Sequence, residues 1–144
     1  MILDRCDLSN VSLAGASLTR VVMSGCKGVG LDLGEAIATS LDVRDSGFKL
    51  ATLIGARLDR CRFTESDLGE VDFDGATLDG VTFSSCRLAG ARFPRARLSR
   101  VDLRGSELAG ALFEPAALPS ITITPVQAPD LLAAMGVRIE GLSP

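Results

Sequence analysis

The sequence predicts an all-β protein, a four-sided β-helix of about six coils of 20 residues each, followed by a short C-terminal helical cap. Two observations predict this fold. Large apolar residues recur at every fifth position from Leu3 to Ile123 with two exceptions, and small residues sort with a second period of 20. A period of five fits neither a helix, where it spreads apolar residues over every face, nor a straight strand, where it alternates between the two sides.

Each five-residue unit reads as one short extended side followed by a corner. Phe73 and Leu78 are the centres of two successive units, and Val71 and Ala76 stand two positions before them. Residues two apart on an extended chain point to the same side, so each unit carries two inward side chains. Nine of the 15 glycines, such as Gly75, stand at the last position of a unit. A corner needs a permissive backbone there, and four corners close one coil.

A four-sided coil requires that the choice of side chain repeats every 20 residues, and it does. One inward position is always alanine and another is cysteine or serine. The alanine positions are Ala16, Ala36, Ala56, Ala76, Ala96 and Ala116. The cysteine and serine positions are Cys6, Cys26, Ser46, Ser66, Cys86 and Ser106. Coils spaced like neighbouring strands, about 4.8 Å apart, would form a rod on the order of 30 Å long.

Units such as Ala76-Thr77-Leu78-Asp79-Gly80 resemble the pentapeptide-repeat family, and the resemblance extends over residues 1–123. It implies a right-handed quadrilateral β-helix, the pentapeptide-repeat solenoid. It also brings in a function, because the best-understood members are quinolone-resistance proteins that bind DNA gyrase as an acidic mimic of duplex DNA. The pattern departs at Gly28 and Ala38, which replace bulky centres. We expect a local kink or an under-filled coil within residues 26–39.

Residues 124–144 leave the repeat and are read as a C-terminal helix/strand cap or a dimerisation segment. Thr124 can cap a helix with Pro125 in its first turn, Gly136 can end that helix, and residues 137–139 could add a short strand. A repeat rod needs its open end covered, which favours capping. The resemblance suggests a homodimer through the same segment, and the two roles can coexist. The candidate residues for either role are Leu131, Leu132 and Met135.

Composition argues against several classes of function. The chain of 144 residues has a net charge of −3 and contains no His, Trp or Tyr. The commonest general base and metal ligand is therefore missing, and no catalytic or nucleotide-binding motif appears. We expect no enzyme activity, no cofactor and no metal, and we interpret the four inward cysteines as free thiols that fill space. No basic leader and no apolar run of about 18 residues is present, so a cytoplasmic protein without a membrane span is the default expectation.

Outward charged residues sort onto the sides of the coil. The side centred on Leu13 through Phe113 has five carboxylates against Arg92 and Arg95, a net charge of −3. The next side, centred on Leu18 through Leu118, has five arginines against two aspartates, a net charge of +3. The acidic stripe consists of Asp32, Glu35, Asp72, Asp74 and Glu114. The basic stripe consists of Arg20, Arg57, Arg60, Arg97 and Arg100.

Two functions stay open at this point. The first is a non-enzymatic rigid rod, a protein-interaction or structural module whose protein partner is unknown. The second is a DNA mimic that binds DNA gyrase and modulates topoisomerase activity or sensitivity to quinolones or toxins. A duplex mimic needs about one negative charge per 1.7 Å, well over ten on such a rod. The net charge of −3 is far below that number.

Other surface features give weaker indications. Direct nucleic-acid binding by the basic stripe finds little support, because no aromatic residues interleave its arginines. Several apolar residues are expected to point outward near the irregular coil, where a partner could bind. These residues are Val22, Val29, Ile37, Leu50 and Ile54.

Overall fold

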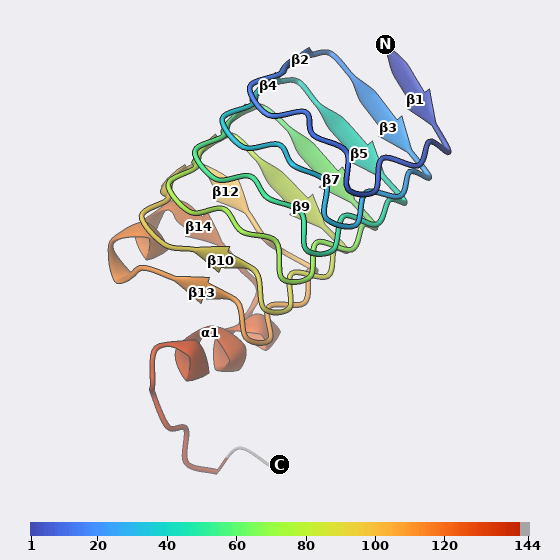
Figure 1. Cartoon of the computed structure of the whole chain (residues 1–144). Helices are drawn as coiled ribbons and strands as arrows, with labels where there is room; N and C mark the ends of the chain where they lie inside the picture. The colour runs from blue at the N-terminus through green and yellow to red at the C-terminus, as the bar shows by residue number, and fades with distance from the viewer. Residues whose placement is uncertain (142–144) are drawn as a thin grey trace.

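The computed structural model describes residues 1–141, most of which stack as coils of a four-sided β-helix (Figure 1). Neighbouring strands pair in parallel with a shift of one coil, so that Ile2 lies beside Val22 and Leu3 beside Met23. The predicted period of 20 is therefore the number of residues in a coil. The N-terminus lies at one end of the stack, and the only α-helix of the described chain lies at the other.

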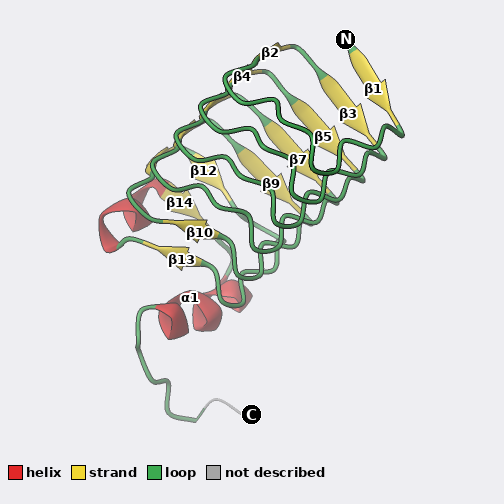
Figure 2. Cartoon of the chain, viewed as in Figure 1, coloured by secondary structure: helices red, strands yellow, loops and turns green. Residues whose placement is uncertain are grey.

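We number the four faces in the order in which the chain meets them, with centres at Leu3 (face 1), Leu8 (face 2), Leu13 (face 3) and Leu18 (face 4) and at their equivalents in later coils. Face 1 is a seven-stranded sheet of β1 (Ile2–Asp4), β3 (Val22–Ser24), β5 (Asp42–Arg44), β7 (Arg62–Thr64), β9 (Thr82–Ser84), β12 (Val101–Asp102) and β14 (Ile121–Thr122). Face 4 is a five-stranded sheet of β2 (Ser17–Thr19), β4 (Ile37–Thr39), β6 (Arg57–Asp59), β8 (Thr77–Asp79) and β11 (Arg97–Ser99). Faces 2 and 3 consist mainly of isolated parallel bridges, and face 3 ends in β10 (Arg92–Phe93) and β13 (Leu112–Phe113). Figure 2 separates these strands from the turns between them.

The inward positions form one apolar core along the axis of the rod. Phe73, Phe83 and Phe93 are completely buried. The rings of Phe73 and Phe93 stack with centroids 4.6 Å apart, and the ring of Phe113 continues that stack at 4.5 Å from Phe93. Such ring stacking adds to the stabilisation that comes from burial itself. The apolar side chains that recur with a period of five are thus buried in the core, as the sequence predicts.

The corners share one backbone conformation. Every fifth residue from Arg5 to Gly110 has a positive φ, between 48° and 82°. This left-handed region is strained for residues with a side chain, and glycine enters it without that cost. The preference for glycine at the last position of a unit follows from this geometry. Leu50, with φ of 63°, shows that the coil also forces other residues into it.

The irregular second coil is under-filled but does not kink. Its hydrogen-bond register continues, since the Gly28 N–H donates to the Gly47 carbonyl at 2.7 Å. A Cβ atom at Gly28 would lie 2.5 Å from the ring of Phe48, so that ring occupies the missing side chain's place. Ala38 lines an apolar void of ≈ 10 Å³. The expected kink is therefore wrong, and the expected under-filling is confirmed.

The repeat ends earlier on face 4 than its pattern indicates. Ala116 is exposed and Leu118 only half-buried, because the 3₁₀ helix η1 (Pro115–Ser120) replaces a sixth strand there. Pro115 and Pro119 lack the N–H that a strand donates to its neighbour, which explains the change. The prediction that Ala116 continues the buried alanine column is therefore wrong. Residue 121 returns to the register of face 1 as the first residue of β14.

The C-terminal segment folds as a short helical cap. The 3₁₀ helix η2 (Pro125–Gln127) begins after Thr124, whose N–H donates to the Gln127 side-chain oxygen at 2.8 Å, and α1 (Ala128–Ala134) follows. Gly136, with φ of 81°, comes directly after the helix C-cap. Residues 137–139 form no strand, so that expectation is wrong. The end of the predicted segment, residues 142–144, lies outside the described residues.

Candidate interaction surfaces

Gln127 closes the C-terminal end of the β-helix. Its buried side-chain Nε2 donates to the carbonyls of Leu103 at 2.7 Å and Ser106 at 2.8 Å. One coil earlier, the Ser106 hydroxyl donates to the Phe83 carbonyl, and the Glu107 N–H donates to the Cys86 carbonyl. The Gln127 amide therefore replaces two donors that a further coil would supply. The sequence analysis missed this residue, although its position three residues after Thr124 matches a capping box.

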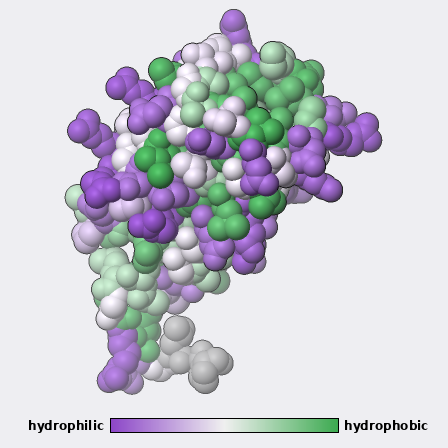
Figure 3. Space-filling model, in the orientation of Figure 1, coloured by the Kyte–Doolittle hydropathy of each residue, from purple (hydrophilic) through white to green (hydrophobic). Residues whose placement is uncertain are grey.

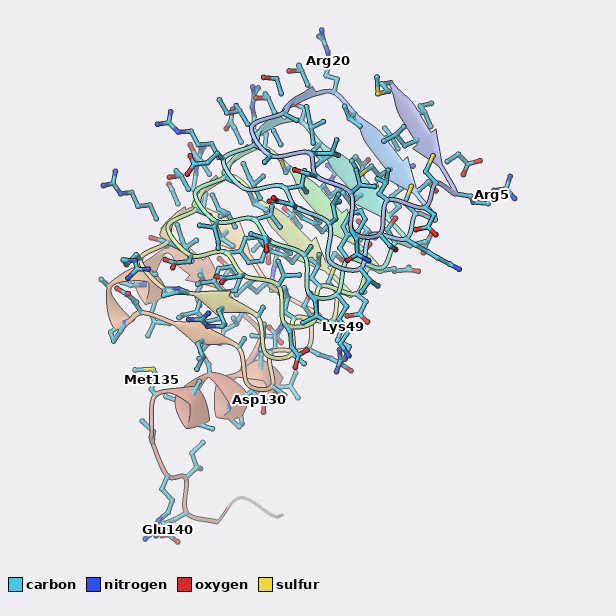
Figure 4. The ribbon with its side chains drawn as sticks, viewed as in Figure 1. Arg5, Arg20, Lys49, Asp130, Met135 and Glu140 are labelled. Carbon is cyan, nitrogen blue, oxygen red and sulfur yellow. The ribbon has the colours of Figure 1, made fainter. Side chains whose placement is uncertain are left out.

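The residues proposed for a cap or a dimer lie on and just after α1. Leu131 and Leu132 are half-buried, whereas Met135 is 45% exposed. Figure 4 shows the Met135 side chain pointing away from the coils. This helix therefore has both a covered side and an exposed apolar residue.

The inward cysteine and serine positions bind backbone groups. The N–H groups of Cys26 and Cys86 donate to the hydroxyls of Ser46 and Ser106, each at 3.1 Å. Burial raises the pKa of the Cys61 and Cys86 thiols. A raised pKa keeps a thiol protonated and poorly nucleophilic. These positions serve packing and backbone pairing.

Face 3 contains the whole acidic stripe, but arginines of the same face neutralise part of it. Asp72 pairs with Arg92 at 3.4 Å, and Asp74 forms a two-point ion pair with Arg95, whose Nε donates at 3.0 Å. Glu114 accepts the backbone N–H of Arg95 at 2.8 Å but forms no ion pair with any described residue. Asp32 and Glu35 form none either and lie together in the second coil. The free negative charge therefore lies in the second and sixth coils and not in a continuous stripe.

Face 4 contains the basic stripe, and ion pairs neutralise only part of it. Arg60 pairs with Asp59 at 3.2 Å, and Arg100 pairs with Asp79 at 2.7 Å. The hydrogen bonds that Arg100 donates to the Asp79 carboxylate raise the pKa of Arg100. The remaining three members form no ion pair with residues 1–141. These are Arg20, which extends away from the coils in Figure 4, Arg57 and Arg97.

Faces 1 and 2 mix charges of both signs. On face 1, Arg104 pairs with Asp102 at 2.7 Å, and its hydrogen bonds lower the pKa of that carboxyl group. On face 2, Arg87 lies between Asp67 at 3.5 Å and Glu107 at 3.9 Å. Neither face keeps a surplus of one sign over several coils.

The described surface has shallow hollows. One hollow of ≈ 260 Å³ lies at the corner between faces 4 and 1 and is lined by Ser40, Leu41, Asp42, Arg60 and Arg62. No group of three or more potential metal ligands comes together in residues 1–141. Within the same residues, no helix has the length and apolar character that crossing a bilayer requires.

Exposed apolar residues are spread over several faces. Val29 and Leu50 lie on face 2, Ile54 on face 3 and Ile37 on face 4, each between 43% and 52% exposed. Val22, expected to point outward, is half-buried on face 1. In Figure 3, apolar side chains reach the surface as separate patches between hydrophilic ones. These four exposed residues lie on three different faces.

The chain is similar to known proteins in its repeat and in its fold. A family model described as pentapeptide repeats in 9 copies matches residues 3–92 and 58–118. HetL, a pentapeptide repeat protein involved in heterocyst differentiation regulation from the cyanobacterium Nostoc, is 19% identical over 85% of this chain and 67% of that chain, with a TM-score of 0.50. At this identity the similarity shows the fold alone. No curated protein sequence matches the chain significantly.

Two further solved structures are similar over most of this chain. A pentapeptide repeat protein from the Arabidopsis thaliana thylakoid lumen is 24% identical over 90% of this chain and 76% of that chain, with a TM-score of 0.49. QnrB1, a plasmid-mediated fluoroquinolone resistance protein, is 18% identical over 94% of this chain and 90% of that chain, with a TM-score of 0.31.

Proposed function

The chain belongs to the pentapeptide-repeat family, and from this premise we propose that it is a non-catalytic rigid rod that binds a protein partner through one of its side faces. The observation that carries the proposal is the sorting of outward charges by face, with rows of side chains that repeat once per coil. A regular rod has little besides its long faces with which to bind. Complementary charge on such a face provides specificity and speeds association.

Site-specific cross-linking tests this proposal directly. A photoreactive amino acid is placed at one outward position on each face in turn, namely Thr82, Ala89, Thr52 and Thr77 for faces 1 to 4. A docking rod is expected to cross-link one protein from one face, or from two adjacent faces, in the cells that produce it. Equal labelling from all four faces, or from none, would contradict the proposal.

The family resemblance brings a second candidate, a mimic of duplex DNA that binds DNA gyrase, and the acidic stripe on face 3 favours it. The ion pairs of Asp72 and Asp74 weigh against it, because they reduce the negative charge that a mimic would present. Supercoiling by purified gyrase, titrated with this protein with and without a fluoroquinolone, tests the candidate. Inhibition or drug protection that disappears with Asp72→Lys/Asp74→Lys would support it. No effect at a large molar excess would exclude it.

A homodimer through the C-terminal segment is a separate proposal, supported by the exposed Met135 beside the half-buried Leu131 and Leu132. Sedimentation equilibrium of the wild type and of Met135→Asp tests it. A wild-type dimer that the substitution converts to a monomer would support the proposal. A monomer at all concentrations would reject it.

A further inference from the structure

The four faces differ in the charge that they leave unpaired. Face 4 keeps three arginines that form no ion pair with residues 1–141, and face 3 keeps three such carboxylates, Asp32 and Glu35 in the second coil and Glu114 in the sixth. The unpaired charges of faces 1 and 2 have both signs. Among the described residues, the surplus of face 4 therefore recurs in the first, third and fifth coils, whereas on face 3 the ion pairs of Asp72 and Asp74 separate the unpaired carboxylates of the second coil from that of the sixth.

The unpaired arginines of face 4 follow the axis of the rod. Arg57 pairs in register with Thr77, and Thr77 with Arg97, so the two arginines lie two coils apart. With about 4.8 Å per coil, their backbones are about 10 Å apart. Arg20 extends the charge into the first coil. A segment that lies lengthwise along face 4 could meet all three.

The floor between these arginines is suited to a protein segment. Ile37, 50% exposed, lies in register with Arg57 and offers an apolar contact in the coil between Arg20 and Arg57. The row beside it consists of Thr19, Thr39, Asp59, Asp79 and Ser99. The charged phosphodiester backbone of a nucleic acid would make no favourable contact with this isolated apolar side chain.

Asp59 and Asp79 stand in register in adjacent coils, and because each pairs with an arginine, they do not discriminate between phosphates and carboxylates. One observation argues against a nucleic acid on the same face. All six aromatic residues are phenylalanines that pack in the core, so none is available to stack on a base.

We infer that face 4 is the docking face and that its occupant is an acidic protein segment with at least one apolar side chain, which packs on Ile37 while its carboxylates pair with Arg20, Arg57 and Arg97. This inference rests on the proposed function and names the chemistry of the partner. Unpaired cations gain most from such a segment, because the partner's carboxylates do not have to replace carboxylates already bound.

Fluorescence anisotropy tests the inference with a labelled oligoglutamate peptide that contains one central leucine, at low ionic strength. The test variant is Arg57→Gln/Arg97→Gln, and the matched control is Arg44→Gln/Arg104→Gln, which removes the same charge from face 1. Saturable binding should weaken about tenfold in the test variant and less than about twofold in the control. Circular dichroism verifies that both variants are folded.

A second comparison isolates the apolar contact. Ile37→Ser should weaken binding of the leucine-containing peptide and leave binding of an all-glutamate peptide unchanged. Loss of both to the same degree would overturn the role assigned to Ile37.

Other outcomes would overturn the inference as a whole. These are the absence of saturable binding, equal losses in both double variants, and tighter binding of duplex DNA with the same dependence on Arg57 and Arg97. Self-association that Arg57→Gln/Arg97→Gln abolishes would identify the occupant as a second copy instead. The cross-linking experiment distinguishes failure of this inference from failure of the proposed function. A partner captured from another face would support a rod that binds a protein and would reject face 4 as the docking face.

Discussion

The small void in the second coil leads to a prediction about stability. Ala38 is completely buried and faces an apolar void of ≈ 10 Å³ that Met23, Val43 and Phe48 also line. Ala76 is equally buried, but it does not line that void. The same substitution, alanine to valine, should therefore stabilise the protein at one position and destabilise it at the other.

The magnitude follows from the size of the void. At about 24 cal/mol per Å³, filling it contributes about 0.2 kcal/mol, and burying one added methyl group contributes about 0.8 kcal/mol. Valine adds two methyl groups and the void accepts about one, so the second must displace neighbours. The expected gain for Ala38→Val is between about 0 and 1 kcal/mol. Ala76→Val overpacks its site and should cost about 1–3 kcal/mol.

Thermal and urea unfolding of the two single variants measure the contrast. In a chain of this size, one kcal/mol shifts Tm by about 2–4 °C. Tm should stay the same or rise with Ala38→Val and fall clearly with Ala76→Val. Equal destabilisation by both substitutions would refute the reasoning, because it would mean that the second coil is packed as tightly as the rest.

Three further predictions concern the cap, the corners and the thiols. Gln127→Ala leaves two buried carbonyls without their donor, so it should cost about 1–3 kcal/mol in thermal unfolding; an unchanged Tm would show that water replaces the amide. Leu50→Gly relieves a left-handed backbone and should stabilise by up to about 1 kcal/mol in urea unfolding; a loss would mean that its side chain contributes more than the strain costs. Burial raises the pKa of the Cys61 and Cys86 thiols. Both should therefore resist an aromatic disulfide reagent in the native protein and react after denaturation, as mass spectrometry of the labelled peptides can show; rapid native labelling would contradict their burial.

The repeat could be predicted from the sequence because each five-residue unit meets the same local requirements, whatever its coil. Val71 and Phe73 must face inward together, and the next corner must turn left-handed, whatever the neighbouring coil contains. The face of every outward residue follows from its number, so the acidic and basic stripes lie where the sequence places them. The sequence analysis did not predict where the repeat ends on face 4, although Pro115 and Pro119 indicate that no strand forms there.

The functional details depend on contacts that a period does not encode. Asp74 pairs with Arg95, 21 residues away, because two side chains reach across a coil boundary, and another choice of rotamer would leave both free. The role of Gln127 depends on which carbonyls the last coil leaves unpaired. Both features required the three-dimensional arrangement before the free charge of each face could be determined.

Hydroxyl-radical footprinting of the complex with the cross-linked partner tests the central claim most directly. The account predicts protection that recurs with the coil period on face 4, at Ile37, Arg57 and Arg97, while the exposed side chains of Val29 and Leu50 on face 2 stay as reactive as in the free protein. Protection confined to the C-terminal segment, or to another face, would contradict the claim that the protein binds its partner along face 4.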